Sequence, residues 1–457
     1  MPEGTAAFDA KPTSRNVRSG GGTRAPDGFG LLSVEVDCSA AIGSHSGLDA
    51  LRPTRGLVKA LIAAPVAVVV VVIVLLFVVW LDHWRSTELL PPTGPYPVGR
   101  TNLIWSDQER DTRAPGPDEQ RKVVAWIWYP ATRPSDTSAY AEYLPATLRQ
   151  ALREHTGALL SGLFQRDLSR VQGHSFQDAD VSAGQRTYPV VLLRGGHTAL
   201  VAAYTTLAED LASHGYVVAG LDAPYRTFVV VLPGRGAIER TVDNNVERVS
   251  GQAAVDRATE LVGAWSADMR FAVDQLERLN ASDAAGRFSG RLDLSRLGAF
   301  GHSLGGAEAL QFCHDDPRCK AGVDIDGAPF NSVVDEGLSQ PFLFLMSDHA
   351  GEVDPEERWI RANFTALFNR LAPEHTERLM IRGASHFGFA DDTKSPIAVG
   401  LVDLVARKID PRRQLSISRE CVRTFFDIHL QGARKNTLCN SQQYPEIVAN
   451  WMGVDQP

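Results

Sequence analysis

Ser303 stands in a segment whose residue types suit nucleophilic chemistry, 300–306, with the sequence FGHSLGG. The apolar run 297–300 leads into it, and the helix-compatible run 307–312 follows it. A serine in Gly-x-Ser-x-Gly between a buried strand and a helix is held on a tight turn that exposes its hydroxyl. The amide of Leu304 is then expected at the helix N-terminus, where it can face a developing oxyanion. The motif predicts that Ser303 is a nucleophile.

A serine hydroxyl is a weak nucleophile unless a base accepts its proton, and the predicted base is His386. In α/β-hydrolases the order along the chain is Ser, then Asp or Glu, then His. His386 follows the strand-like run 379–381 on a glycine-containing loop. His302 lies inside the serine turn and is expected to point away from Ser303, and His349 has no suitably placed acid.

Two carboxylates qualify for orienting the histidine. Asp326 ends an apolar run directly after the strand that follows the nucleophile, and Asp348 ends the next strand. Both are expected at carboxyl ends of strands, where α/β proteins form their sites. Asp324 alternates with Asp326 along the strand and is expected on the opposite face. Position alone leaves Asp326 and Asp348 open.

The second oxyanion donor is expected from a glycine-containing loop after an early strand. The segment 190–197, with the sequence VVLLRGGH, has that form. A backbone amide of Gly196 or its neighbour is predicted to complement that of Leu304, because glycines let a loop approach the substrate closely.

Apolar runs alternate with amphipathic stretches over most of the chain, which predicts the elements that carry these residues. Strands are expected at 123–129, 190–193, 217–221, 297–300, 321–325, 342–346 and 379–381, and helices at 200–214, 254–279, 305–314 and 359–371. This alternation predicts an α/β-hydrolase fold, with a mostly parallel central sheet and helices on both faces. The segments 138–186 and 226–251 interrupt it, either as walls or lids of the pocket or as surface decoration.

One segment, 60–81, contains no charged residue and is long enough to cross a hydrocarbon core of roughly 30 Å. We therefore expect four parts: a disordered cytoplasmic tail (1–56), a single transmembrane helix (57–82), a proline-rich linker (83–97) and a catalytic domain (98–457). Arg52, Arg55 and Lys59 precede the span, whereas Arg85 alone follows it closely. The positive-inside rule then predicts a cytoplasmic N-terminus and an extracytoplasmic catalytic domain.

Net charge and cysteine content indicate which partners and which cellular compartment to expect. The formal net charge is −8 and no basic stripe is present, which argues against a nucleic-acid partner. Four cysteines follow the span, and an even number suits an oxidising compartment. Cys313–Cys319 and Cys421–Cys439 are the natural local pairs, the alternative being four buried thiols.

The chain resembles the plasma-type platelet-activating-factor acetylhydrolase family of α/β-hydrolases and its bacterial relatives. The matching segments lie between Thr93 and Asp391 and include TGPYPVG (93–99), VAWIWYP (124–130), YPVV (188–191), LAEDLASHGY (207–216) and 293–306. The resemblance implies Asp326 as the acid, because that family places the acid after the strand that follows the nucleophile, in an Asp-Gly or Asp-Ala context. It also matches His386, Phe389 and Asp391 to the family's histidine loop.

The oxyanion segment departs from that family. Relatives commonly read Ser-His-Gly or Ser-Pro-Gly where this chain has Leu193-Arg194-Gly195-Gly196-His197. The backbone amides still serve, but Arg194 and His197 leave the pocket chemistry undefined. Because the family also contains polyester- and lipid-hydrolysing relatives, the resemblance does not imply acetyl specificity.

These observations predict a membrane-anchored serine hydrolase that cleaves carboxylic esters, lipid-like or with acetyl or short acyl groups, through an acyl-enzyme. The alternatives are an acyltransferase that uses the same triad and a non-catalytic receptor on a hydrolase scaffold. The expected partners are a small-molecule or lipid ester and, through 60–81, the membrane. No metal or organic cofactor is expected.

Overall fold

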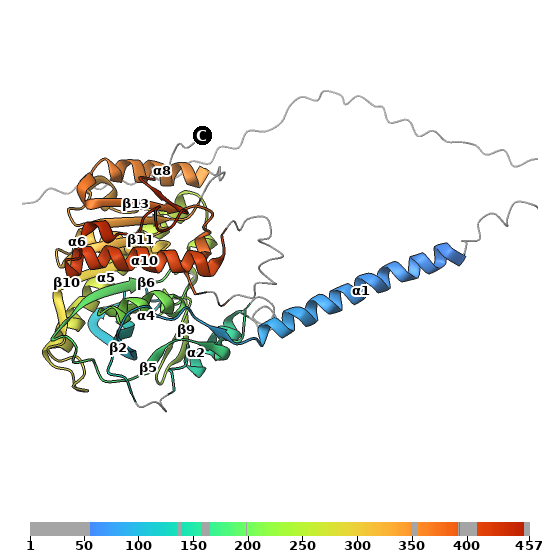
Figure 1. Cartoon of the computed structure of the whole chain (residues 1–457), viewed down its shortest axis with the longest axis horizontal. Coiled ribbons are helices and arrows are strands. Elements are labelled where there is room, and N and C mark those ends of the chain that lie inside the picture. The colour runs from blue at the N-terminus through green and yellow to red at the C-terminus, as the bar shows by residue number, and fades with distance from the viewer. Residues whose placement is uncertain are drawn as a thin grey trace, which may run out of the picture. The chain divides into compact units, whose positions relative to one another are not determined.

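The computed structural model describes residues 55–134, 139–156, 165–197, 199–348, 355–391, 393 and 409–451. Most of the expected N-terminal tail, as well as His349, lies outside these residues. Residues 1–67 and 68–457 form two units, and the first of them is described only from Arg55 onward. Figure 1 shows the chain coloured by residue number.

Helix α1, Arg55–His83, contains the uncharged segment. Its part Ala63–His83 is long and apolar enough to cross a membrane, judged by length and composition. Side chains 63–78 are all exposed. Such a row of exposed valine and leucine side chains is unfavourable in water and suits a hydrocarbon surrounding.

The segment 83–97, expected as a linker, is built into the folded body. Strand β1, Thr87–Glu88, pairs in parallel with β4, Val171–Gln172. Both the amide and the hydroxyl of Thr93 donate to Asp210 Oδ1, at 2.9 and 2.8 Å. The prolines stiffen this segment, but its hydrogen bonds attach it to the domain, and the linker prediction is wrong on that point.

Ten strands of the described chain form one sheet in the order β14, β13, β12, β11, β10, β6, β7, β3, β2 and β5. From β13 to β7 the strands are parallel, while β14 and β3 join antiparallel. The bounds are β2 Val98–Arg110, β3 Gln120–Pro130, β5 Ser175–Gln177, β6 Tyr188–Arg194, β7 Val217–Asp222, β10 Leu292–His302, β11 Cys319–Ile325, β12 Phe342–Met346, β13 Thr376–Ile381 and β14 Ile447–Ala449. All seven predicted strands are present, and the predicted mostly parallel sheet is confirmed.

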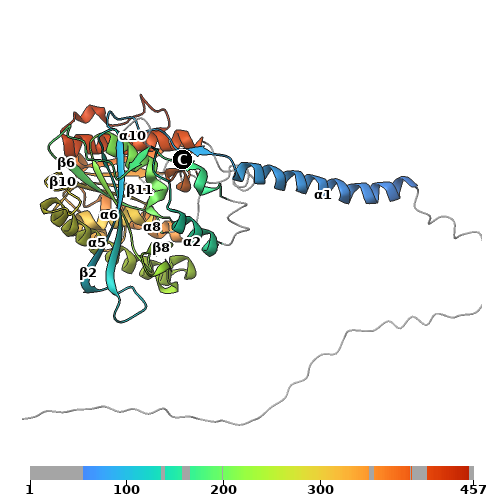
Figure 2. The same cartoon turned by 90° about the horizontal axis from the view of Figure 1, so that it is seen from below.

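Helices cover both faces of this sheet, because successive side chains of a buried strand point to opposite sides. Val191 and Leu193 belong to the core under α4 and α10, whereas Val190 and Leu192 belong to the core under α5, α6 and α8. Figure 2 shows α10 on one side of the strands and α5, α6 and α8 on the other. The bounds are α4 Thr205–Ser213, α5 Gln252–Ala281, α6 Leu304–Asp315, α8 Pro355–Phe368 and α10 Pro411–Gln431.

Helix α10 was not predicted, although its signals are local. Asp410 caps it by accepting from the Arg413 amide at 3.0 Å, and Pro411 occupies the first turn, where its missing N–H costs nothing. The helix ends at Gly432, whose φ of 76° is a left-handed conformation that glycine adopts without strain.

The two interrupting segments carry small elements of their own. The first contains α2 (Ala146–Thr156), η2 (Leu168–Arg170), β4 and β5. The second contains the hairpin β8–β9 (Val229–Leu232 and Gly236–Glu239), followed by the turns η4 (Val242–Asn244) and η5 (Val246–Arg248). Short elements elsewhere are η3 Val201–Tyr204, α7 Val333–Glu336, η6 Pro373–His375, η7 His386–Phe389 and η8 Lys435–Thr437.

Both predicted disulfides are formed. Cys313–Cys319 joins the end of α6 to the start of β11, and Cys421–Cys439 joins α10 to the segment that follows it. Each cross-link restricts the unfolded chain and thereby stabilises the fold. The first one fixes the two elements that flank the Ser303 site.

Candidate active site

Ser303 lies on the sharp turn between β10 and α6, with φ 57° and ψ −130°. This region is unfavourable for a residue with a side chain, so the surrounding packing must hold it. The Ser303 amide donates to the Ile325 carbonyl at 2.8 Å. A Cβ on Gly301 would lie 2.1 Å from the Gly305 carbonyl oxygen, so the turn closes only with glycine there. The sequence therefore holds the hydroxyl of the half-buried Ser303 in a fixed position.

His386 connects this hydroxyl to a carboxylate. Its Nε2 lies 3.1 Å from Ser303 Oγ, and its Nδ1 lies 2.7 Å from Asp326 Oδ2. The imidazole is 33% exposed, while the Asp326 side chain is fully buried. His386 begins η7, on the loop that follows β13. Three residues from three strand ends thus form a continuous hydrogen-bonded chain.

Asp326 is held in place by further donors. Ser347, directly after β12, donates its amide to Oδ1 at 2.8 Å and its hydroxyl to Oδ2 at 2.6 Å. A buried carboxylate is stable when such donors replace water. The structure therefore provides for an ionised Asp326 beside the imidazole of His386.

Asp348, the alternative acid, has a different contact. Its Oδ2 accepts from the Gly383 amide at 2.7 Å, and its own amide donates to the Ala384 carbonyl at 3.1 Å. Gly383 and Ala384 belong to the loop that leads to His386. Asp348 therefore supports the histidine loop, and the carboxylate paired with His386 Nδ1 is that of Asp326.

Asp324 is fully buried in β11, with its Oδ1 against Gly306 of α6. Residues two apart in a strand share a face, so alternation along β11 does not separate it from Asp326, contrary to the expectation above. Its Oδ1 accepts from the Gly327 amide at 2.8 Å, while its Oδ2 has no hydrogen-bond partner among the described residues. Burial, together with the nearby charge of Asp326, raises the pKa of Asp324 well above its usual range.

The glycine loop after β6 lies against the nucleophile. A Cβ on Gly196 would be 3.3 Å from Ser303 Cβ. However, the Gly196 amide donates to the Tyr204 hydroxyl at 3.1 Å. Within the described residues, neither the Leu304 amide nor the His197 amide donates such a hydrogen bond. Leu304 is the first residue of α6, where helix N–H groups lack intrahelical partners.

His302 lies beside His386, contrary to the expectation that it turns away from the site. Its ring centroid is 4.6 Å from that of His386, and its Nδ1 is 2.8 Å from the Tyr204 hydroxyl. Tyr204 therefore bridges Gly196 and His302. The sequence analysis missed Tyr204, whose only signal was its place in the predicted helix 200–214 next to the glycine loop.

A metal is a poor fit to these side chains. Ligand-type atoms of His302, Asp326 and His386 lie within 4.8 Å of one another. Both ring nitrogens of His386 are already hydrogen-bonded, one to Ser303 and one to Asp326. The arrangement is suited to moving a proton between the serine and the imidazole.

Arg194 is one of the two residues by which the oxyanion segment differs from the related family, and its side chain is buried against α5 and α6. Its Nε donates to Glu308 Oε2 at 2.9 Å, its NH1 contacts the Leu221 carbonyl, and its guanidinium lies over the ring of Trp265. Burial raises the pKa of Glu308 to about 7, although Arg194 opposes this shift. The side chain of Arg194 thus joins the strand that ends at the glycine loop to the nucleophile helix.

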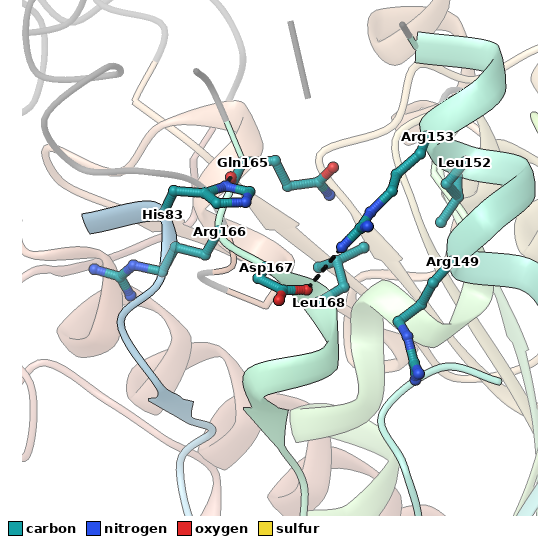
Figure 3. Close-up of a pocket in the computed structure, with 8 residues that line it drawn as sticks. All are labelled: His83, Arg149, Leu152, Arg153, Gln165, Arg166, Asp167 and Leu168. Carbon is teal, nitrogen blue, oxygen red and sulfur yellow. Dashed lines mark hydrogen bonds and ion pairs between the residues drawn. The ribbon is translucent and has the colours of Figure 1, made fainter. Parts of the chain in front are cut away.

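A separate hollow lies where the end of α1 meets α2 and the segment before η2 (Figure 3). Arg153 reaches from α2 to Asp167, with 3.1 Å between Nη2 and Oδ1, and His83 Nδ1 lies 2.7 Å from the Gln165 carbonyl. The hollow is lined by His83, Arg149, Leu152, Arg153, Gln165, Arg166, Asp167 and Leu168. None of these residues belongs to the group around Ser303.

Comparisons with known proteins give one consistent class. Residues 83–227 match the family described as platelet-activating factor acetylhydrolase, isoform II, and residues 229–417 match the PET hydrolase-like family. A platelet-activating factor acetylhydrolase of Cavia porcellus is 23% identical over 376 residues, which cover 75% of this chain and 78% of that protein. A probable 1-alkyl-2-acetylglycerophosphocholine esterase of Arthroderma benhamiae is 25% identical over 407 residues, which cover 79% of this chain and 94% of that esterase.

More distant relatives carry other esterase names. Cutinase 2 of Thermobifida cellulosilytica is 26% identical over 201 residues, which cover 44% of this chain and 61% of the cutinase. A solved structure of a ferulic acid esterase from Streptomyces cinnamoneus superposes with a TM-score of 0.65 at 25% identity, covering 80% of this chain and 100% of the esterase. Ester cleavage is the activity common to these names, whereas the acyl groups in them differ.

Proposed function

We propose that Ser303, His386 and Asp326 are the catalytic triad of this carboxylic ester hydrolase, whose sequence is similar to the platelet-activating factor acetylhydrolase family and whose fold is that of an α/β-hydrolase. The observation that carries the proposal is the hydrogen-bonded chain from Ser303 Oγ through both nitrogens of His386 to Asp326, at 3.1 and 2.7 Å. These are the contacts that a serine nucleophile, a general base and an orienting acid require.

In the proposed reaction Ser303 Oγ attacks the ester carbonyl while His386 Nε2 takes its proton. The resulting imidazolium is stabilised by the Asp326 carboxylate. When the tetrahedral intermediate collapses, His386 returns the proton to the leaving alcohol and an acyl-serine remains. A water molecule, deprotonated by His386, then attacks the acyl carbonyl and releases the acid and the free serine.

Two backbone amides are proposed to hold the oxyanion of each tetrahedral intermediate. One is that of Leu304, at the start of α6, where the helix dipole also favours negative charge. The other was expected from Gly196 or its neighbour. Because the Gly196 amide already donates to Tyr204, we assign the second donor to the His197 amide.

We propose further that the Ala63–His83 part of α1 anchors the enzyme in a membrane. The positive charges before the span favour a cytoplasmic N-terminus. Two disulfides in the part of the chain after the span support an oxidising, extracytoplasmic location for the catalytic domain. An enzyme at that surface is well placed to meet lipid-like esters or other esters with short acyl groups.

Turnover of p-nitrophenyl esters by the full-length protein in detergent tests the triad. Ser303→Ala is expected to abolish hydrolysis, while Ser295→Ala, an exposed serine earlier in β10, retains it. The rates for a series from acetyl to long acyl esters then show which acyl chain lengths the pocket accepts. Hydrolysis by Ser303→Ala at the wild-type rate would remove Ser303 from the mechanism. Adding a competing alcohol and analysing the products separates hydrolysis from acyl transfer.

The anchor is tested on isolated membranes, and its orientation is tested on cells that express the protein. Alkaline carbonate should leave the protein in the membrane fraction, and an external protease should reach the catalytic domain after the outer barrier is opened. Extraction of the protein by carbonate would contradict the anchor. Protection of the catalytic domain from the protease, on the cytoplasmic side, would contradict the proposed orientation. Neither outcome bears on the triad.

A further inference from the structure

The hairpin β8–β9 and the turns after it contact the glycine loop at His197. The loop carries an oxyanion donor in the proposed function, yet the described residues 195–197 contain two glycines, which leave the backbone free in many conformations. A donor of this kind stabilises charge only if it is held in position before the reaction. Some other part of the fold must therefore restrict His197.

Two hydrogen bonds from the inserted segment end on His197. Arg240 Nη1, just after β9, donates to the His197 carbonyl at 2.7 Å. The Val246 amide, at the start of η5, donates to His197 Nε2 at 3.1 Å. The side chain of Arg240 is only 6% exposed, so water competes little for its bond.

The imidazole of His197 must be neutral to accept from Val246. Burial, and then the charge of Arg240, lower the pKa of His197 to about 4. The ring therefore keeps an acceptor lone pair at neutral pH. Asn245 Oδ1 is a second neighbour of Nε2 at 3.4 Å, which is longer than the Val246 contact.

The segment that supplies these bonds is itself fastened to the body. Arg257 on α5 donates to the Val242 carbonyl at 3.1 Å and to the Asn245 carbonyl at 2.8 Å. On the other side, His155 of α2 pairs with Glu239 of β9 at 3.0 Å. The inserted segment is therefore a supported element that can transmit a fixed position to His197.

We propose that Arg240 and the Val246 amide form a clamp that fixes the His197 peptide as an oxyanion donor, which makes Arg240 a positioning residue for ester hydrolysis. This inference rests on the proposed triad and oxyanion hole. It assigns the segment 226–251 a role that neither a lid nor surface decoration would have. Arg240 acts through the His197 carbonyl, on the same residue whose N–H is assigned to the oxyanion.

The test compares two arginines of the same hairpin in the full-length enzyme. Arg240 bonds to His197, whereas Arg235 in the hairpin turn bonds to Glu119 at 2.7 Å. For Arg240→Ala we expect kcat for p-nitrophenyl acetate to fall roughly 10- to 100-fold with little change in KM, less than the roughly 100- to 1,000-fold cost of losing a whole donor. Arg235→Ala is expected to match the wild type, and Arg240→Lys, which keeps one donor, to lie between.

A trifluoromethyl ketone provides a readout that a general loss of stability does not move. It adds to Ser303 as a hemiketal whose oxyanion uses the same donors, so its inhibition constant should rise by the factor by which kcat falls. The clamp would be overturned if Arg240→Ala behaved like Arg235→Ala. It would also be overturned if Arg240→Ala raised KM while kcat and the inhibition constant stayed unchanged. Loss of the proposed function itself is recognised separately, by hydrolysis that survives Ser303→Ala.

Discussion

Replacing Asp326 by asparagine tests which carboxylate orients His386, and the structure predicts how the amide will sit. The Ser347 amide donates to Oδ1 at 2.8 Å, so the asparagine oxygen is retained there and the NH2 group takes the Oδ2 position, 2.7 Å from His386 Nδ1. An N–H donor at that position forces Nδ1 to accept. The ring proton then resides on Nε2, where it cannot take the proton of Ser303.

The expected loss is large because the wrong tautomer removes the base. In serine hydrolases of known mechanism this exchange lowers kcat roughly 10,000-fold. At 1.36 kcal/mol for each factor of ten, that is about 5.4 kcal/mol of transition-state stabilisation. The assay is kcat for p-nitrophenyl acetate, with thermal unfolding as the check that the variant is folded.

Two neighbouring aspartates serve as matched controls. Asp324→Asn should stay within about twofold of wild type, because the asparagine oxygen can keep the bond from the Gly327 amide and burial already disfavours the charged form of Asp324 by raising its pKa. Asp348→Asn should cost at most about tenfold, because Asp348 supports the histidine loop through Gly383 and does not contact Ser303 or His386 Nδ1 in the chain of hydrogen bonds above. The reasoning is refuted if Asp326→Asn keeps a tenth of wild-type activity, or if Asp348→Asn falls as far as Asp326→Asn.

Three further predictions concern the scaffold. Because the pKa of Glu308 is raised to about 7, its protonated form contributes to the free energy of unfolding. This contribution is fully present below about pH 4.5 and is lost as the pH rises through about 7. Glu308→Gln should therefore flatten the fall of Tm between about pH 5 and 8. Removing the disulfide with Cys421→Ser and Cys439→Ser should lower the free energy of unfolding by about 3 kcal/mol in denaturant titrations. Tyr204→Phe, which frees the Gly196 amide, should lower kcat roughly tenfold without changing the chain-length preference for esters, and an unchanged kcat would contradict its bridging role.

Seven of the ten strands of the central sheet were predictable because buried strands are continuous apolar runs. Six of these seven are parallel, and β3 is antiparallel to both of its neighbours. Strand β2 was missed for the complementary reason. Its segment Val98–Arg110 mixes buried and exposed residues near the edge of the sheet, and polar residues flank its apolar run 103–105 on both sides. Helix α10 was missed although its signals, the Asp410 cap and the Gly432 end, are both present in the sequence.

The choice between Asp326 and Asp348 shows where local sequence reasoning ends. Both residues follow parallel strands, so their positions in the chain are equivalent. What distinguishes them is the path of the loop after β13, which brings His386 to Asp326 while Gly383 meets Asp348. The resemblance to a family favoured Asp326, and the geometry agrees with that choice.

The contacts of Tyr204 and the clamp on His197 could not be predicted from the sequence for a related reason. Each connects segments that are distant along the chain, such as Tyr204 with His302 and Arg240 with His197. No periodicity or spacing encodes such a contact, because it depends on how inserted segments fold back over the sheet. The serine turn was the opposite case, since its glycines and its strand-to-helix position are all local.

The central claim, that Ser303 is the nucleophile, is tested most directly by mapping a covalent adduct. The full-length protein is treated with a fluorophosphonate, digested and sequenced by tandem mass spectrometry. The account predicts one phosphonylated serine, Ser303, and loss of the adduct when His386 is replaced by alanine. An adduct on another serine, or none on an enzyme that hydrolyses p-nitrophenyl acetate, would contradict it.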